Sequence, residues 1–213
     1  MPRAKTIFDQ FRKPDGWLGR FILWRMNRGH SNLTDWGLAH ISIKESDTIL
    51  DVGCGGGRTA GKLAARASLG KVYGIDYSPE SVAASRKTNA RWIAMGRVEI
   101  RQGTVSQLPF PDGAFDLVTA VETQYFWPDL AADMREVFRV LKPGGSFILI
   151  AEVYKGGQKM AKKLSEKHVE MKILSVEEHC ELFARTGYAE IQVIEEREKE
   201  WLCGIGKKPP ISN

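Results

Sequence analysis

The chain alternates between short apolar runs and stretches with helical periodicity. The apolar runs are rich in Val, Ile and Leu, which favour buried strands, and they lie at residues 48–52, 71–76, 97–102, 115–121 and 146–153. Between them, the stretches 58–67, 78–95 and 128–141 place apolar residues three and four positions apart, as on one face of a helix. This alternation predicts an α/β protein with helices on both faces of one sheet.

Two further strands are expected at residues 190–200 and 201–207, as an antiparallel edge hairpin. A helix precedes them, because Ser175 and Glu178 have the spacing of a capping box and Gly187 stops the helix. Ser78, followed by a proline, predicts the start of the helix after the second strand. Pro128 is expected to open the helix after the fourth strand.

The first strand ends in an acid and runs directly into a glycine-rich loop, residues 53–57. Glycine adopts positive φ and lets a ligand approach the backbone, so this loop suits a nucleoside-type cofactor. The dinucleotide pattern G-x-G-x-x-G fails here, because Arg58 occupies the position of its third glycine. The pattern that remains is D-x-G-x-G-x-G, and it starts at Asp51.

This pattern resembles the first motif of the class I S-adenosylmethionine-dependent methyltransferases, in particular their small-molecule subgroup. The segments L-P-F at 108–110, F-D-L-V at 115–118 and L-K-P-G-G at 141–145 resemble the same family. The resemblance covers roughly residues 48–153. It implies a Rossmann-like, doubly wound, seven-stranded mixed sheet that is mostly parallel. It also implies S-adenosylmethionine as cofactor and transfer of its methyl group to an acceptor.

The resemblance gives each end of the cofactor a partner. Asp51 would attract the ammonium of the methionine moiety, although a carboxylate here could also cap the glycine turn. Asp76 ends the second strand and would accept the ribose hydroxyls, or it could cap the next helix. The cofactor-binding candidates are Asp51, Gly53, Cys54, Gly55, Asp76, Tyr77, Gly103, Thr104, Val105, Val121 and Asn27.

The adenine side departs from the family pattern at Thr104. The family usually carries an acid there, which accepts a bond from the adenine amino group. A threonine hydroxyl can accept the same bond, and the amide of Val105 could meet a ring nitrogen. The alternative is that Thr104 is simply a residue at a strand end.

The acceptor face is expected just after the fourth strand. Tyr125, Phe126 and Trp127 would wall a small, partly apolar acceptor, or the last two could staple the following helix. The candidate general bases are Glu122, Tyr125 and His30. The chain lacks both the Pro-Pro-aromatic loop of nucleic-acid amino methyltransferases and a Pro-Cys nucleophile pair, which favours a small-molecule acceptor.

The sequence is expected to fold as an N-terminal helical lid at residues 1–47 and a cofactor-binding domain at 48–213. In the lid, residues 17–28 form an amphipathic, aromatic and basic stretch. Three roles are open to it: packing on the core, placing Asn27 and His30 at the pocket, or lying on a membrane surface. A lysine-rich helical insertion is expected near residues 155–173, either attracting an anionic acceptor or forming a solvated face.

Composition narrows the class of protein. The 213 residues are 43% hydrophobic and 27% charged, and no apolar run approaches the roughly 20 residues of a membrane helix. Three widely spaced cysteines suit reduced thiols better than disulfides or a metal site, and no secretory signal is evident, so a cytoplasmic protein is expected. The net charge of +5 is too modest to require nucleic acid. A non-catalytic cofactor-binding module and an RNA methyltransferase are the alternative functions.

Overall fold

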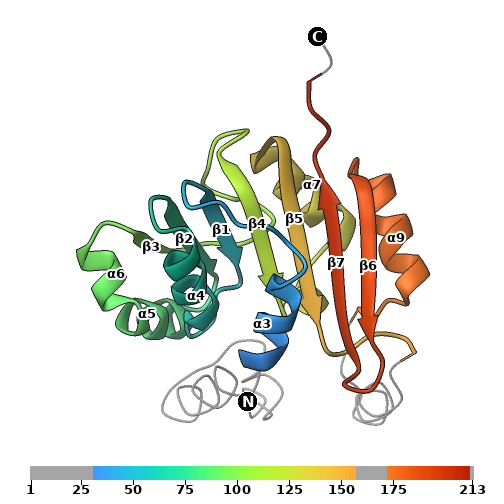
Figure 1. Ribbon diagram of the computed structural model, residues 1–213, viewed down its shortest axis with the longest axis horizontal. Helices are drawn as coiled ribbons and strands as arrows, with labels where there is room; N and C mark the ends of the chain where they lie inside the picture. Colours follow the sequence, from blue (N-terminus) through green and yellow to red (C-terminus); the bar gives the residue numbers. More distant parts are fainter. Residues whose placement is uncertain (1–30, 157–171, 212–213) are drawn as a thin grey trace, which may run out of the picture.

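The computed structural model describes residues 31–156 and 172–211. Seven strands form one sheet in the order β3-β2-β1-β4-β5-β7-β6 (Figure 1). The strands are β1 (Thr48–Val52), β2 (Lys71–Asp76), β3 (Val98–Gln102), β4 (Phe115–Val121), β5 (Leu141–Ala151), β6 (Ala189–Glu196) and β7 (Trp201–Lys207). The first five are parallel, whereas β7 is antiparallel to both β5 and β6. The predicted α/β fold with a mostly parallel sheet and an antiparallel edge hairpin is confirmed.

Helices cover both faces of this sheet and divide the core into two clusters. The helices are α3 (Ser31–Leu38), α4 (Arg58–Arg66), α5 (Pro79–Thr88), α6 (Ala90–Ala94), α7 (Leu130–Val140) and α9 (Val176–Arg185), with a short 3-10 helix η1 (Gln124–Phe126). Leu33 of α3, Leu63 of α4 and Val82 of α5 belong to one cluster, and α7 and α9 bury Met134 and Phe183 in the other. Figure 1 shows α3 and α4 lying on the same side of the sheet.

Side-chain caps begin the helices α5, α7 and α9. The Ser78 hydroxyl accepts from the amide of Ser81, and Ser175 forms the expected capping box with Glu178. Pro128 is not the first helical residue, because α7 begins at Leu130 and Asp129 caps it through the amides of the two following alanines. The prediction that Pro128 opens this helix is therefore wrong by two residues.

A tertiary contact breaks the helix that was predicted over residues 78–95. It divides into α5 and α6 at Asn89. The Asn89 side-chain amide donates to the carbonyls of Gly57, at 2.8 Å, and Ser85, at 3.0 Å. Because Gly57 belongs to the glycine loop, the break ties this helix pair to that loop.

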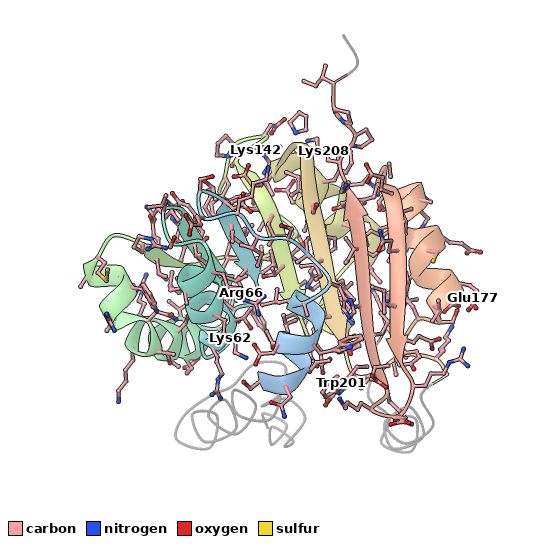
Figure 2. The ribbon with its side chains drawn as sticks, in the orientation of Figure 1. Lys62, Arg66, Lys142, Glu177, Trp201 and Lys208 are labelled. Atoms are coloured by element: carbon pink, nitrogen blue, oxygen red, sulfur yellow. The ribbon has the colours of Figure 1, made fainter. Side chains whose placement is uncertain are left out.

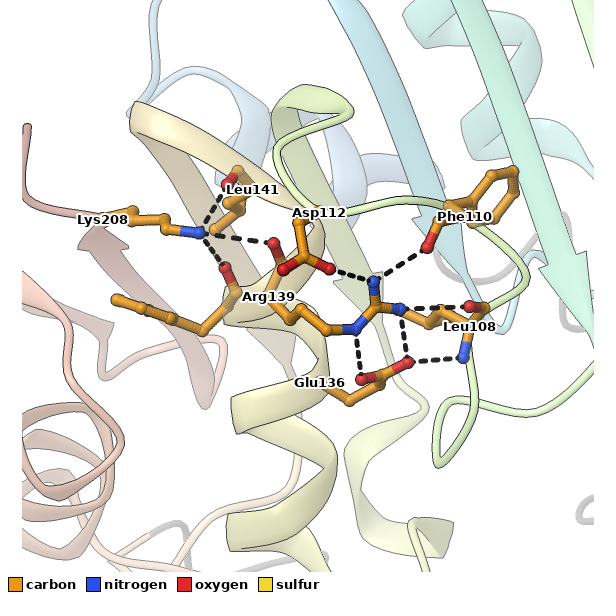
Figure 3. A network of polar contacts seen from close by, with 8 residues as sticks. Leu108, Phe110, Asp112, Glu136, Arg139, Leu141 and Lys208 are labelled. Carbon is orange, nitrogen blue, oxygen red and sulfur yellow. Dashed lines mark hydrogen bonds and ion pairs between the residues drawn. The ribbon is translucent and has the colours of Figure 1, made fainter. Parts of the chain in front are cut away.

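The connection from β3 to β4 is a loop that Arg139 of α7 holds in place (Figure 3). Its guanidinium donates to the carbonyls of Leu108 and Phe110 and forms ion pairs with Asp112 and Glu136, both at 2.7 Å. These bonds raise the pKa of Arg139, chiefly through Glu136. Lys208 donates to three carbonyls at the end of α7, which further fixes this side of the molecule.

Several expectations fall on residues 1–30 and 157–171, which lie outside the described residues. They concern Asn27, His30, the amphipathic stretch 17–28 and the body of the lysine-rich insertion. The division into a lid at 1–47 and a domain at 48–213 stays a prediction, with α3 as its described portion. Within the described ranges, no helix has both the length and the apolar character needed to span a membrane.

Candidate functional site

A cavity of about 330 Å³ opens at the carboxyl ends of β1, β2 and β4, beside the glycine loop. Its size falls within the range of small-molecule sites. The lining residues come from α3, from the glycine loop and the start of α4, from the ends of the strands, and from the segment after β4. They are Thr34, residues 51–56, Arg58, Thr59, residues 75–77, Ser81, residues 103–105, residues 121–123 and residues 126–128.

Two glycines of the loop show why the backbone must turn as it does. Gly55 has φ +49 and lines the cavity, and a Cβ built there would lie no nearer to any atom than 4.0 Å. Gly57 has φ +82, and a Cβ there would lie 2.3 Å from the Ser85 hydroxyl oxygen. Gly55 therefore leaves open space for a ligand, whereas Gly57 allows close packing of the loop against α5.

Asp51 is the most unusual group of the cavity wall. Its side chain is 1% exposed, and one carboxylate oxygen accepts a 2.7 Å bond from the Thr119 hydroxyl of β4. The other oxygen, Oδ2, is buried and has no hydrogen-bond partner among the described residues. Burial, together with the nearby charge of Asp76, raises the pKa of Asp51 to about 7, although the Thr119 bond opposes this shift. A buried acceptor without a partner is costly, so this atom is suited to a cationic or hydrogen-bonding ligand.

Asp76 is buried where β2 ends, and it shapes the loop as well as the cavity. Its Oδ2 accepts from the amide of Gly55 and its Oδ1 from the amide of Ser78, both at 2.9 Å. Burial raises the pKa of Asp76, and these two amides partly offset that shift. Because each carboxylate oxygen can accept two bonds, Asp76 retains acceptor capacity toward the cavity. Both interpretations of Asp76 are compatible with this geometry, although the Ser78 hydroxyl is the direct cap of α5.

The candidates for the adenine side also line the cavity. Gly103, Thr104 and Val105 form this part of the wall, and Val105 is 8% exposed. The Thr104 hydroxyl accepts from the amide of Ser106 at 3.3 Å, so one of its acceptor positions is occupied. Tyr77 reaches the wall with a side chain that is 40% exposed. The cavity thus includes every cofactor candidate among the described residues.

The segment after β4 builds the other end of the cavity. Glu122 has φ +58, a strained conformation for a residue with a side chain, and its carboxylate accepts from the Tyr125 hydroxyl at 3.0 Å. The Tyr125 hydroxyl in turn accepts from the amide of Val153 at 3.0 Å. Burial, followed by the charge of Glu122, holds the pKa of Tyr125 well above its usual range. Among the described residues, Glu122 lines the cavity, whereas the buried Tyr125 does not and contacts the cavity through the Glu122 carboxylate.

The aromatic residues predicted as acceptor walls divide in the structure. Phe126 and Trp127 line the cavity, and the Trp127 indole donates to the Thr123 hydroxyl at 3.1 Å. Tyr125 is 3% exposed and is not among the lining residues in the described part of the chain. The expectation that all three rings form the wall thus holds for two of them. The proton-transfer roles suggested for Glu122, Tyr125 and His30 stay predictions.

The sequence patterns did not identify Thr34, Arg58 and Thr119 as residues of the site. Arg58 and its neighbour follow the glycine loop directly, so the loop itself was the available signal. Thr119 is the register partner of Asp51 across β1 and β4, which only the strand pairing reveals. Thr34 comes from α3, and no local motif marks it.

The matched family model describes a methyltransferase domain and covers residues 50–149. The chain is 36% identical over 111 residues to the sterol 24-C-methyltransferase erg6 of Aspergillus fumigatus, covering 52% of this chain and 29% of that protein. It is 32% identical over 119 residues to the 27-O-demethylrifamycin SV methyltransferase of Amycolatopsis mediterranei, covering 56% of this chain and 43% of that protein. The matches therefore span less than half the length of these relatives.

The fold is also similar to that of solved structures. A chain from the solved complex between the Haloferax volcanii Trm112 methyltransferase activator and a methyltransferase superimposes with a TM-score of 0.80, covering 97% of this chain and 99% of that chain. The two sequences are 24% identical, so this likeness concerns the fold. The matched segment contains the glycine loop, Asp51 and Asp76, and it is the segment that builds most of the cavity. Residues 50–149 thus match a methyltransferase domain, and together with these relatives they support a class I S-adenosylmethionine-dependent methyltransferase.

Proposed function

We propose that this protein transfers the methyl group of S-adenosylmethionine to a small-molecule acceptor. The observation that carries the proposal is the buried, unpartnered Oδ2 of Asp51 in the wall of the cavity. A carboxylate in that position attracts an ammonium group and repels a pyrophosphate. The match to a methyltransferase domain and the relatives that act on a sterol and on a rifamycin support the same proposal.

The residues present fit this cofactor. The ionised carboxylate of Asp51 pairs with the ammonium of the methionine moiety, and Gly55 leaves room for the ligand beside the loop. The free acceptor positions of Asp76 bind the ribose hydroxyls. The wall at Gly103 and Val105 receives the adenine. When bound, the cofactor supplies a sulfonium-activated methyl group that is transferred in line to a nucleophile.

The protein's main contribution to the reaction is to position the acceptor. Phe126 and Trp127 give the acceptor end an apolar wall, which excludes water and orients a partly apolar molecule. Glu122 presents a carboxylate at the same end and accepts a proton from a hydroxyl or amine acceptor. Tyr125 and the amide of Glu152 both donate to Glu122 Oε1, and these bonds orient the carboxylate.

The first test is isothermal titration of the full chain with S-adenosylmethionine, S-adenosylhomocysteine and NAD. We expect both sulfur ligands to bind with one-to-one stoichiometry and NAD not to bind. Conversion to S-adenosylhomocysteine is then followed with pools of small-molecule acceptors. Binding of NAD alone would overturn the proposal. Binding of S-adenosylmethionine without turnover on any pool would favour the non-catalytic module, and turnover on RNA only would favour the RNA methyltransferase.

Replacing Asp76 by Ala should weaken cofactor binding by about ten- to a hundredfold, because a charge-assisted bond contributes about 1.5–3 kcal/mol. The change also frees the amides of Gly55 and Ser78, which Asp76 holds in the structure. Asp76→Asn keeps one carbonyl oxygen and is the matched control, with an intermediate loss expected. Titration calorimetry measures both values, and an unchanged affinity in Asp76→Ala would remove Asp76 from the site.

The expected cytoplasmic location remains a proposal. Its support is that Cys54, Cys180 and Cys203 are free thiols in the structure, and Cys54 lies in the cavity wall. Free thiols suit a reducing compartment.

A further inference from the structure

Helix α3 contributes one residue to the cavity from outside the matched family segment. Thr34 lines the cavity and is 3% exposed, and it is the lining residue that precedes β1 within the described ranges. The family match begins at residue 50, so α3 lies before it. The position of α3 relative to the glycine loop therefore sets one dimension of the cavity.

One face of α3 packs tightly on the sheet. Leu33 and Leu38 are each 1% exposed in the core cluster shared with α4. A Cβ on Gly37 would lie 2.4 Å from the end of the Ile150 side chain, so α3 approaches β5 closely at this point. This apolar contact holds α3 on the sheet, but apolar packing alone is non-directional and leaves the helix free to shift along the surface.

Two cations of α4 fix α3 at both of its ends (Figure 2). The Lys62 ammonium donates to the carbonyl and hydroxyl oxygens of Ser31, both at 2.9 Å, and pairs with Asp35 at 2.6 Å. One turn further along α4, the Arg66 guanidinium donates to the carbonyl of Leu38 at 3.0 Å. Lys62 and Arg66 are four residues apart and thus share one face of α4.

Lys62 and Arg66 together form a clamp on α3. Both belong to α4, the helix that begins directly after the glycine loop. Gly57 is the N-cap of α4, and its carbonyl accepts from the amide of Gly61 at 3.1 Å. Lys62 follows within the same helical turn, so its distance from the loop is fixed by helix geometry. The clamp therefore fixes Thr34 relative to the backbone that borders the ligand.

We propose that Lys62, assisted by Arg66, is a positioning residue that locks α3 onto α4 and so completes the cofactor cavity with Thr34. This inference rests on the proposed function, because the occupant of the cavity is taken to be S-adenosylmethionine. Its consequence is reciprocal: a docked α3 strengthens cofactor binding, and bound cofactor stabilises the docking of α3. The clamp is partly exposed, with Lys62 at 20% and Asp35 at 53%, so it contributes little to overall stability.

The test uses Lys62→Met in the full chain, which keeps an unbranched side chain one atom shorter and removes the charge. We expect the Kd for S-adenosylmethionine to rise about three- to tenfold. We also expect the amides of residues 33–38 to exchange hydrogen faster in the ligand-free variant, and saturating cofactor to restore part of their protection. Lys62→Arg, which retains the cation, should recover most of the affinity.

Lys142→Met is the matched control. It breaks an ion pair of similar length, 2.7 Å to Asp116, at the far end of the sheet, and it should leave both readouts unchanged. If Lys62→Met binds the cofactor as tightly as the wild type, the positioning role is refuted, whatever the exchange rates show. A wild-type chain that does not bind S-adenosylmethionine would instead refute the proposed function, and the exchange measurement would still report on whether Lys62 docks α3.

Discussion

Asp51→Asn should raise the Kd for S-adenosylmethionine by about thirtyfold or more, because truncating one partner of a buried charge pair costs about 2–5 kcal/mol. The substitution is close to isosteric. It keeps an oxygen for the Thr119 hydroxyl and removes only the charge that the ammonium requires. Titration calorimetry at pH 7.5 measures the change. A variant that binds within twofold of the wild type would show that the charge of Asp51 does not contribute to cofactor binding.

The pH dependence gives an independent check on Asp51. Its pKa is raised to about 7 in the ligand-free protein, so the ionised form that pairs with an ammonium disappears as pH falls below 7. The wild-type Kd should therefore rise by close to tenfold for each pH unit between about 7 and 5.5. Asp51→Asn should lose this dependence. A flat wild-type profile would contradict the assignment.

The stability of the ligand-free protein should change with pH in the direction opposite to its cofactor affinity. This difference distinguishes a loss of binding from a loss of folding. The folded-state pKa of Asp51 lies above its ordinary value of 3.8, so between these two pH values the folded chain holds more protons than the unfolded chain. The contribution of Asp51 to the free energy of unfolding of the ligand-free wild type therefore falls as pH rises through this window. Asparagine does not ionise, so Asp51→Asn does not lose stability in this way as pH rises. The variant should be at least as stable as the wild type at pH 8, as measured by urea denaturation.

Gly57→Ala should destabilise the fold, whereas Gly55→Ala should mainly weaken cofactor binding. Both residues have positive φ, which costs a side-chain residue roughly 1–2 kcal/mol. At Gly57 the new methyl group would also lie 2.8 Å from the Ser85 Cα, so the total should reach about 2–5 kcal/mol. At Gly55 the methyl group enters the cavity, and we expect a loss of about ten- to a hundredfold in affinity.

Thermal unfolding and titration calorimetry on both variants form the test. Gly57→Ala should lower the Tm by about 5–15 °C, since 1 kcal/mol shifts the Tm of a protein of this size by about 2–4 °C. Gly55→Ala should lower it by only a few degrees. Equal effects of the two substitutions on Tm and on Kd would contradict the assignment of one glycine to packing and the other to the ligand.

The sequence was sufficient for elements whose signals are local. The strand at 48–52, the glycine turn, the Ser78 cap and the Ser175 capping box each depend on residues within a few positions of one another, and each is confirmed. Asp51 and Asp76 line the cavity because each lies near the carboxyl end of a parallel strand, whereas their contacts with the cofactor stay predictions.

Features that depend on distant residues could not be predicted. The helix breaks at Asn89 because its side chain reaches the Gly57 carbonyl, 32 positions away. Tyr125 is buried beside Glu122 because the amide of Val153, two residues beyond the end of β5, donates to its hydroxyl. Thr34 joins the cavity only because α4 and β5 determine where α3 lies. In each case the contacting residue is distant in the sequence and comes close only in the folded structure.

The order of the strands has a consequence for how the protein is made. β7 lies between β5 and β6, although it follows both in the sequence. As the chain leaves the ribosome, β5 must remain an open, hydrogen-bonding edge until residue 207 has emerged, even though the glycine loop and both acids have been available for more than a hundred residues. A nascent chain at that stage displays an unpaired, apolar strand, which is the feature that chaperones protect and that misassembles in their absence.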